Sequence, residues 1–121
     1  MTGFRVRVLD EEMGEEITEE GYRGVNSVWL ALERRGLKEF SSRIFRIEEG
    51  GHTSMHAHER GHLALVLRGS CLLEGAQEEV LLREGSLVEI PSGVPHRFSN
   101  PGRDRLHLLI MNLTPARGEK P

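Results

Sequence analysis

Short runs of alternating apolar and polar residues constrain the fold of this chain more than any other feature of its sequence. Glycine and proline interrupt the runs at Gly50-Gly51, Gly75, Gly85, 91–95 and Pro101-Gly102. Alternation with period two places every second side chain on the same face of a strand, while glycine and proline supply the turns. The pattern predicts strands over Phe4–Leu9, Val28–Glu33, Phe40–Glu48, Ser54–His58, His62–Arg68, Ser70–Glu74, Gln77–Leu82, Leu87–Ile90, His96–Ser99 and Arg105–Thr114.

An all-β architecture follows from strands at this spacing. Because no crossover helices separate the strands, we expect an antiparallel sandwich or barrel of the jelly-roll kind, whose interior is lined by alternate residues. The 121 residues are enough for one hydrophobic core, so we expect a single domain over residues 1–121. We expect the acidic segment Asp10–Glu20 to be solvated surface and the tail 116–121 to be disordered.

Charge and cysteine content exclude several classes of function. The formal net charge is -3 and no basic run exceeds Arg34-Arg35, so we expect neither a nucleic-acid partner nor a membrane partner. The single cysteine, Cys71, excludes an intramolecular disulfide, and its apolar surroundings favour a buried small residue over a reactive thiol. No basic and apolar leader opens the sequence, so a cytoplasmic location is expected.

Four of the six histidines fall in two short segments that the pattern places at strand edges. His56 and His58 are two residues apart, so in a strand both imidazoles point the same way and can chelate one ion. His62 opens the next strand and faces the interior if its neighbours Ala64 and Val66 do. His96 follows the rigid turn over 91–95, which fixes where its strand begins. A lone histidine on an apolar strand is more often a hydrogen-bonded core residue than a ligand, and His-x-His alone is a weak motif.

Both histidine segments carry glycines at regular positions. The first matches the pattern G-x5-H-x-H-x3-(E)-x6-G from Gly50 to Gly69, and the second matches G-x5-P-x-G-x2-H-x3-N from Gly85 to Asn100. In these two segments, 50–69 and 85–100, the chain resembles the cupin superfamily, of the small single-domain (monocupin) type. The resemblance implies a small cupin jelly-roll barrel with a metal inside.

One departure from the family pattern concerns the position where cupins usually have a glutamate, which is His62 here. Either the site has lost a ligand and become a structural barrel, or the chain is a four-histidine cupin. Imidazole is a common ligand of transition metals, so we favour the second interpretation. The resemblance then implies four metal ligands, which are His56, His58, His62 and His96.

The resemblance also ranks the metals. We expect one divalent transition metal per chain, with manganese first and iron, nickel, copper or zinc after it. Manganese leads because the chain is similar to small four-histidine manganese cupins of hyperthermophilic bacteria, both in ligand spacing and around Arg23-Gly24-Val25. Four neutral imidazoles leave the ion its full charge, and two cis positions on an octahedral ion stay open.

These open positions suit a metalloenzyme of the oxidoreductase type that uses dioxygen or peroxide on a small organic substrate, anionic substrates included. Two alternatives stay open, because fold alone does not settle chemistry. One is a non-catalytic domain that senses a small molecule or the metal itself. The other is a cupin isomerase or lyase.

Two further residues are candidates for the pocket. Arg43 shares a strand face with Phe45 and Ile47, so its guanidinium points into an apolar row, where it either pairs with an interior carboxylate or anchors an anionic ligand. Phe98 shares a face with His96 and either walls the pocket or packs in the core. His107 is expected to be structural, and the role of His52 stays open.

The early strand Phe4–Leu9 bears on assembly. Phe4, Val6 and Val8 alternate with Arg5 and Arg7, which leaves one apolar face in need of a cover. We therefore expect a homodimer, in line with the resemblance, since cupins usually pair through such strands.

Overall fold

The computed structural model describes residues 4, 6–31, 40–55, 57 and 61–113. Within these ranges the chain forms strands and one 3-10 turn (Leu9–Glu11), and no α-helix, so the all-β prediction is confirmed. No helix in the described part is long and apolar enough to cross a membrane. The strands are β1 (Glu15–Glu16), β2 (Arg23–Ala31), β3 (Phe40–His52), β4 (Gly61–Arg68), β5 (Cys71–Glu74), β6 (Glu79–Leu82), β7 (Leu87–Ile90), β8 (Arg97–Ser99) and β9 (Leu106–Leu113).

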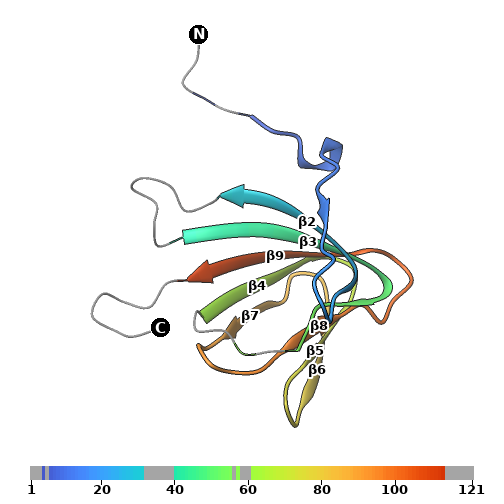
Figure 1. Cartoon of the computed structure of the whole chain (residues 1–121), viewed down its shortest axis with the longest axis vertical. Helices are drawn as coiled ribbons and strands as arrows, with labels where there is room; N and C mark the ends of the chain where they lie inside the picture. Colours follow the sequence, from blue (N-terminus) through green and yellow to red (C-terminus); the bar gives the residue numbers. More distant parts are fainter. Residues whose placement is uncertain (1–3, 5, 32–39, 56, 58–60, 114–121) are drawn as a thin grey trace.

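The strands pair antiparallel in one curled sheet of the jelly-roll type. Their order is β6-β5-β8-β3-β9-β4-β7, with β2 beside β3 and β1 beside β2. Figure 1 shows two facing layers, one of β2, β3, β9 and β4 and the other of β8, β5 and β6. Strand β3 belongs to both layers, because its first part pairs with β2 and β9 while His52 at its end pairs with Ser99 of β8.

Two glycines allow β3 to pass from one layer to the other. Gly50 has a φ of 76°, which an L side chain rarely adopts. A Cβ on Gly51 would lie 2.5 Å from the carbonyl oxygen of Arg23, so only glycine lets β2 approach β3 here. Beyond this bend, β3 lies beside β8, and the N–H of Asn100, the residue after β8, donates to the Gly51 carbonyl.

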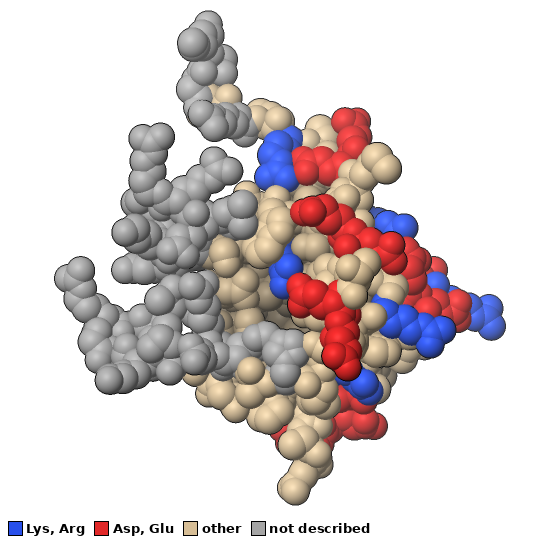
Figure 2. All heavy atoms as spheres, viewed as in Figure 1, with Lys and Arg blue, Asp and Glu red and all other residues tan. Residues whose placement is uncertain are grey.

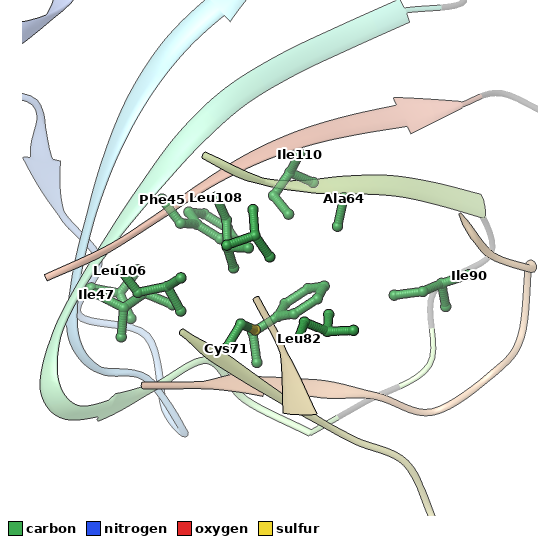
Figure 3. Packing of buried hydrophobic residues seen from close by; sticks show 12 residues of the cluster. Phe45, Ile47, Ala64, Cys71, Leu82, Ile90, Leu106, Leu108 and Ile110 are labelled. Atoms are coloured by element: carbon green, nitrogen blue, oxygen red, sulfur yellow. The ribbon is translucent and has the colours of Figure 1, made fainter. Parts of the chain in front are cut away.

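The core fills the space between the two layers (Figure 3). Alternate residues of β4 and β9 point into it, as the period-two pattern predicts, whereas β6 and β7 each bury only their last residue, Leu82 and Ile90. Cys71 is fully buried, so the prediction of a buried small residue is confirmed, and burial raises the pKa of its thiol to about 12. The buried cluster comprises Val25, Phe45, Ile47, Ala64, Val66, Cys71, Leu82, Ile90, Phe98, Leu106, Leu108 and Ile110.

The sequence-based prediction was wrong for two strands. Phe4 and 6–8 belong to no strand, and the segment then makes the 3-10 turn of Leu9–Glu11. Ser54, Met55 and Ala57 also lie outside any strand, because the ladder of β3 ends at His52. Strands need a paired neighbour as well as an alternating pattern, and these segments have none in the described part of the chain.

Smaller differences concern the N-terminal third. Strand β2 begins at Arg23, five residues before the predicted start at Val28. The acidic segment Asp10–Glu20 contains the 3-10 turn and β1, and most of its carboxylates are exposed as expected.

On the face drawn in Figure 2, Lys and Arg side chains lie among Asp and Glu side chains and form no continuous basic patch.

Candidate metal centre

A cavity of about 490 Å³ opens between the layers of the sheet. Strands β2, β3, β4, β8 and β9 and the segment after β3 contribute its described wall. The volume lies in the range of small-molecule sites. Its described lining comprises Tyr22, Trp29, Ser41, Arg43, Phe45, Thr53, Ser54, Ala57, His62, His96, Phe98, Ile110 and Asn112.

His62 reaches the cavity from the start of β4. Its exposed fraction is 8%, and it shares the inner face with the buried Ala64 and Val66. In the sheet it lies opposite Asn112 of β9, which in turn lies opposite Ser41 of β3. The parity argument therefore placed this imidazole on the correct side of the sheet.

His96 reaches the cavity from the end of the turn over 91–95, and its exposed fraction is 6%. The turn is closed by a hydrogen bond from Val94 N–H to the Pro91 carbonyl, and Gly93 has a φ of 83°. Nδ1 of His96 lies 2.9 Å from the Val94 carbonyl oxygen. A carbonyl only accepts, so Nδ1 carries a proton, and in the neutral form of the ring the lone pair lies on Nε2, as in many metal-binding histidines.

The two imidazoles lie next to each other. Their ring centroids are 5.2 Å apart with an interplanar angle of 65°. This separation, the burial of both rings and the fixed tautomer of His96 fit two ligands of one ion, since metal–nitrogen bonds are about 2 Å long. His56 and His58, the other two predicted ligands, lie outside the described residues.

Arg43 lies on the cavity wall in contact with two aromatic rings. Its guanidinium carbon is 4.5 Å from the ring centroid of Trp29, directly opposite on β2, and 4.4 Å from that of Phe45. Burial lowers the pKa of Arg43, and Tyr22 and Glu19 offset this effect only in part. Arg43 makes no ion pair with any described residue, so the interior carboxylate that the sequence left open is not found there.

Phe98 lies on the wall beside the imidazoles, with its ring centroid 5.6 Å from that of His96. Its backbone N–H donates to Oγ1 of Thr53, and the Thr53 N–H donates to the Phe98 carbonyl. These two bonds hold the segment after β3 against β8. Sequence reasoning missed Thr53 and also Trp29, because their positions depend on strand register, for which the sequence carried no signal.

The other two histidines lie elsewhere. His107 is on the outer face of β9, in a shallow cleft of about 310 Å³ formed with Asp10, Arg46, Arg68 and Arg105. Nδ1 of His52 is 3.1 Å from the Thr53 carbonyl oxygen, and His52 is not among the described residues that line the cavity.

An ion pair holds the strand that follows His96. Arg97 donates from Nε and an Nη to the two carboxylate oxygens of Glu74 on β5, at 3.1 and 2.9 Å, and Ser99 Oγ donates to the same carboxylate. These bonds, from Arg97 first and Ser99 second, hold the pKa of Glu74 below its usual range. The strand that carries His96 into the cavity is thereby fixed to its neighbour.

Comparison with known proteins agrees with this architecture. The polyketide cyclase RemF from Streptomyces resistomycificus superposes with a TM-score of 0.81 at 23% identity, over 91% of this chain and 79% of that one. A predicted oxalate decarboxylase from Thermotoga maritima gives a TM-score of 0.83 at 19% identity, over 92% and 100%. At these identities the likeness concerns the fold alone.

Sequence comparison finds a curated relative and a family. The Xanthan biosynthesis protein XanB from Xanthomonas campestris is 29% identical over 119 residues, which cover 90% of this chain and 25% of XanB. The chain thus spans about a quarter of the length of that relative. The Cupin domain family, Cupin_2, matches residues 43–112, which include Arg43, His62 and His96. With this match over more than half of its length, the chain belongs to the Cupin domain family.

Proposed function

We propose that this cupin is a cytoplasmic, metal-dependent enzyme of the oxidoreductase type, which uses dioxygen or peroxide to oxidise a small organic substrate. The observation that carries the proposal is the pair of buried imidazoles of His62 and His96, 5.2 Å apart on the wall of the cavity. A hydrophobic core is not stabilised by two imidazoles and a guanidinium in one cavity, so their presence there favours a binding or catalytic site.

The metal would be held by His62 and His96 together with His56 and His58. Their donor set is four neutral imidazoles, which several divalent first-row metals accept. We rank manganese first only because of the resemblance to four-histidine manganese cupins, and iron, nickel, copper or zinc after it. When bound, such an ion supplies Lewis-acid polarisation of an anionic oxygen and a binding position for the oxidant.

The chain's own residues would then bind and orient the substrate. The Val94 carbonyl holds the Nδ1 proton of His96 and so keeps Nε2 in its lone-pair form. Phe98, Phe45 and Trp29 exclude water from the wall, and Arg43 supplies the positive charge that orients an anion.

A second candidate function is a non-catalytic domain that binds a small molecule. One observation favours it, which is that the described lining of the cavity contains no Asp or Glu that would serve as a general base. Binding and orientation by Arg43 need no such group.

Turnover measurements separate the two functions. Purified protein is loaded with Mn²⁺ and assayed with β-diketones, catechols and flavonols under dioxygen, and with organic substrates under peroxide. We expect turnover that His96→Ala abolishes and that His107→Ala, on the outer face, retains. Ligand-induced stabilisation without turnover would favour the binding domain, and equal activity of the two variants would contradict a reaction at this site.

A further inference from the structure

The cavity is cationic in its described part. Arg43 contributes a full positive charge, and the described lining has no carboxylate to neutralise it. Glu19 acts on Arg43 only from a distance, since it is exposed, is absent from the lining and makes no ion pair with the guanidinium. A half-buried guanidinium without a counter-charge is unfavourable until an anion neutralises it.

The surroundings of Arg43 restrict the shape of that anion. The guanidinium carbon of Arg43 is 4.5 Å from the ring centroid of Trp29 and 4.4 Å from that of Phe45. The two rings contact the guanidinium and leave its N–H edge for hydrogen bonds to a ligand. Nε of Arg43 is buried and has no hydrogen-bond partner among the described residues. Because the buried Nε is not accessible to a ligand, a carboxylate in the plane of the guanidinium would accept from the two Nη groups.

The remaining wall indicates what the carboxylate is attached to. Tyr22, Trp29, Phe45 and Phe98 bring four aromatic rings to the lining, and Ile110 adds an aliphatic side chain. Flat rings pack by offset stacking or edge-to-face contact, so this wall favours an unsaturated, planar body over a flexible aliphatic chain.

The sheet register separates the cationic end from the imidazole end. Arg43 lies opposite Ile110, and Ile110 lies opposite Ala64, whereas His62 lies two residues before Ala64 on β4. The backbones of Arg43 and His62 are therefore two strands apart, about 10 Å, and two residues apart along the strands, about 7 Å. A ligand whose carboxylate contacts Arg43 would extend its body toward His62 and His96.

We propose that the cavity binds a small aromatic monocarboxylate, with the carboxylate on the edge of Arg43 and the ring directed toward His62 and His96. This substrate class rests on the proposed function, because it assumes the same cavity as the site of reaction. The contact between the carboxylate and Arg43 itself requires no metal.

The single tryptophan, Trp29, reports on this contact, because the Arg43 guanidinium lies over its ring. Benzoate and its neutral analogue benzamide are titrated into chelator-treated and Mn²⁺-loaded protein. Binding is followed by Trp29 fluorescence and by calorimetry. We expect benzoate to bind both forms and benzamide to bind at least about tenfold more weakly, since it lacks the charge that pairs with Arg43.

Variants identify the anchor. Arg43→Gln should weaken benzoate binding by about tenfold or more and leave benzamide binding nearly unchanged. Arg43→Lys keeps the charge without the planar fork and should bind with intermediate affinity, which also covers the case that Arg43→Gln does not fold. Arg105→Gln is the matched control, because Arg105 pairs with Glu48 on the exposed surface, and it should bind benzoate like the wild type.

Several outcomes would overturn this inference. They are equal affinity for benzoate and benzamide, equal losses in Arg43→Gln and Arg105→Gln, and binding of acetate or inorganic phosphate as tight as that of benzoate. If any of them occurs while metal-dependent turnover persists, only the substrate class fails. If benzoate binds the chelated protein as expected but no metal binds, the proposed function fails and the carboxylate site stands.

Discussion

At the scale of single residues, Asn100 shows how a motif position can be structural. Its exposed fraction is 2%. Nδ2 donates to the carbonyls of Ile47 at 2.8 Å and Asp104 at 2.9 Å, and Oδ1 accepts from Gly102 N–H at 2.9 Å. One amide thus joins β3 to the turn between β8 and β9. Asn100 is the last position of the second motif, and the structure shows that its contacts are backbone groups.

Replacing Asn100 by Ala should destabilise the fold by about 2 to 4 kcal/mol, because it leaves buried carbonyls without donors. Urea unfolding followed by Trp29 fluorescence measures the change. Gln77→Ala, at an exposed position, serves as the control and should stay within about 0.5 kcal/mol of the wild type. An equally small change for Asn100→Ala would show that water replaces these bonds.

His107 makes the stability of the fold depend on pH. Burial lowers its pKa below the ordinary 6.5, and Arg68, Arg105 and Arg46 lower it further, while Asp10 acts in the opposite direction. The unfolded chain therefore binds more protons than the folded one just below pH 6.5, so stability falls as the pH drops through this range.

The variant His107→Gln removes this group. Its melting temperature should decrease less than that of the wild type between pH 7.5 and pH 5.5. An equal decrease in the melting temperature of the wild type and of His107→Gln would show that His107 does not titrate as the geometry implies.

At the scale of elements, alternation predicted β4 and β9 well because each of these strands buries one face. Elsewhere it was less informative. Asn26 and Ser27 interrupt the apolar pattern of β2, yet their backbones pair with β3 as regularly as those of their neighbours. The register of Trp29 against Arg43, which shapes the cavity, is likewise set by backbone pairing and a bulge that no side-chain pattern reports.

The glycines of the two motifs were predictable for a physical reason. Gly50, Gly69, Gly85 and Gly93 have φ values of 76°, 90°, 85° and 83°, respectively, which suit glycine far better than other residues. Gly51 is not one of the motif glycines, and it is required because a side chain there would clash with the Arg23 carbonyl oxygen. The constraint comes from Arg23, which is distant in sequence.

The bend of β3 allows a matched comparison. Gly50→Ala meets open space and only its positive φ is unfavourable, so it should cost about 1 to 2 kcal/mol. Gly51→Ala would place a Cβ 2.5 Å from the Arg23 carbonyl oxygen and should cost more, about 3 kcal/mol. Urea unfolding of both variants gives the order, and a larger loss for Gly50→Ala would contradict the close packing of β2 on β3.

At the scale of the whole molecule, the N-terminal segment bears on assembly. The exposed fractions of Phe4, Val6 and Val8 are 84%, 85% and 55%. Although the described residues of this segment form no strand, apolar side chains this exposed favour burial against a partner. We therefore keep the homodimer as a proposal.

Light scattering at micromolar concentration should give the mass of two chains for the wild type. The double variant Val6→Glu with Val8→Glu should give the mass of one chain, because two carboxylates would enter the apolar contact. A monomeric wild type, or a double variant that stays dimeric, would contradict pairing through this segment.

The central claim is that His62 and His96 belong to a single metal site inside the cupin sheet. Metal content after dialysis against Mn²⁺ and removal of the excess tests it most directly. We expect about one equivalent per chain for the wild type and for His107→Ala, and a large loss for His62→Ala and His96→Ala alike. A wild type without bound metal, or a His62→Ala variant that keeps a full equivalent, would contradict it.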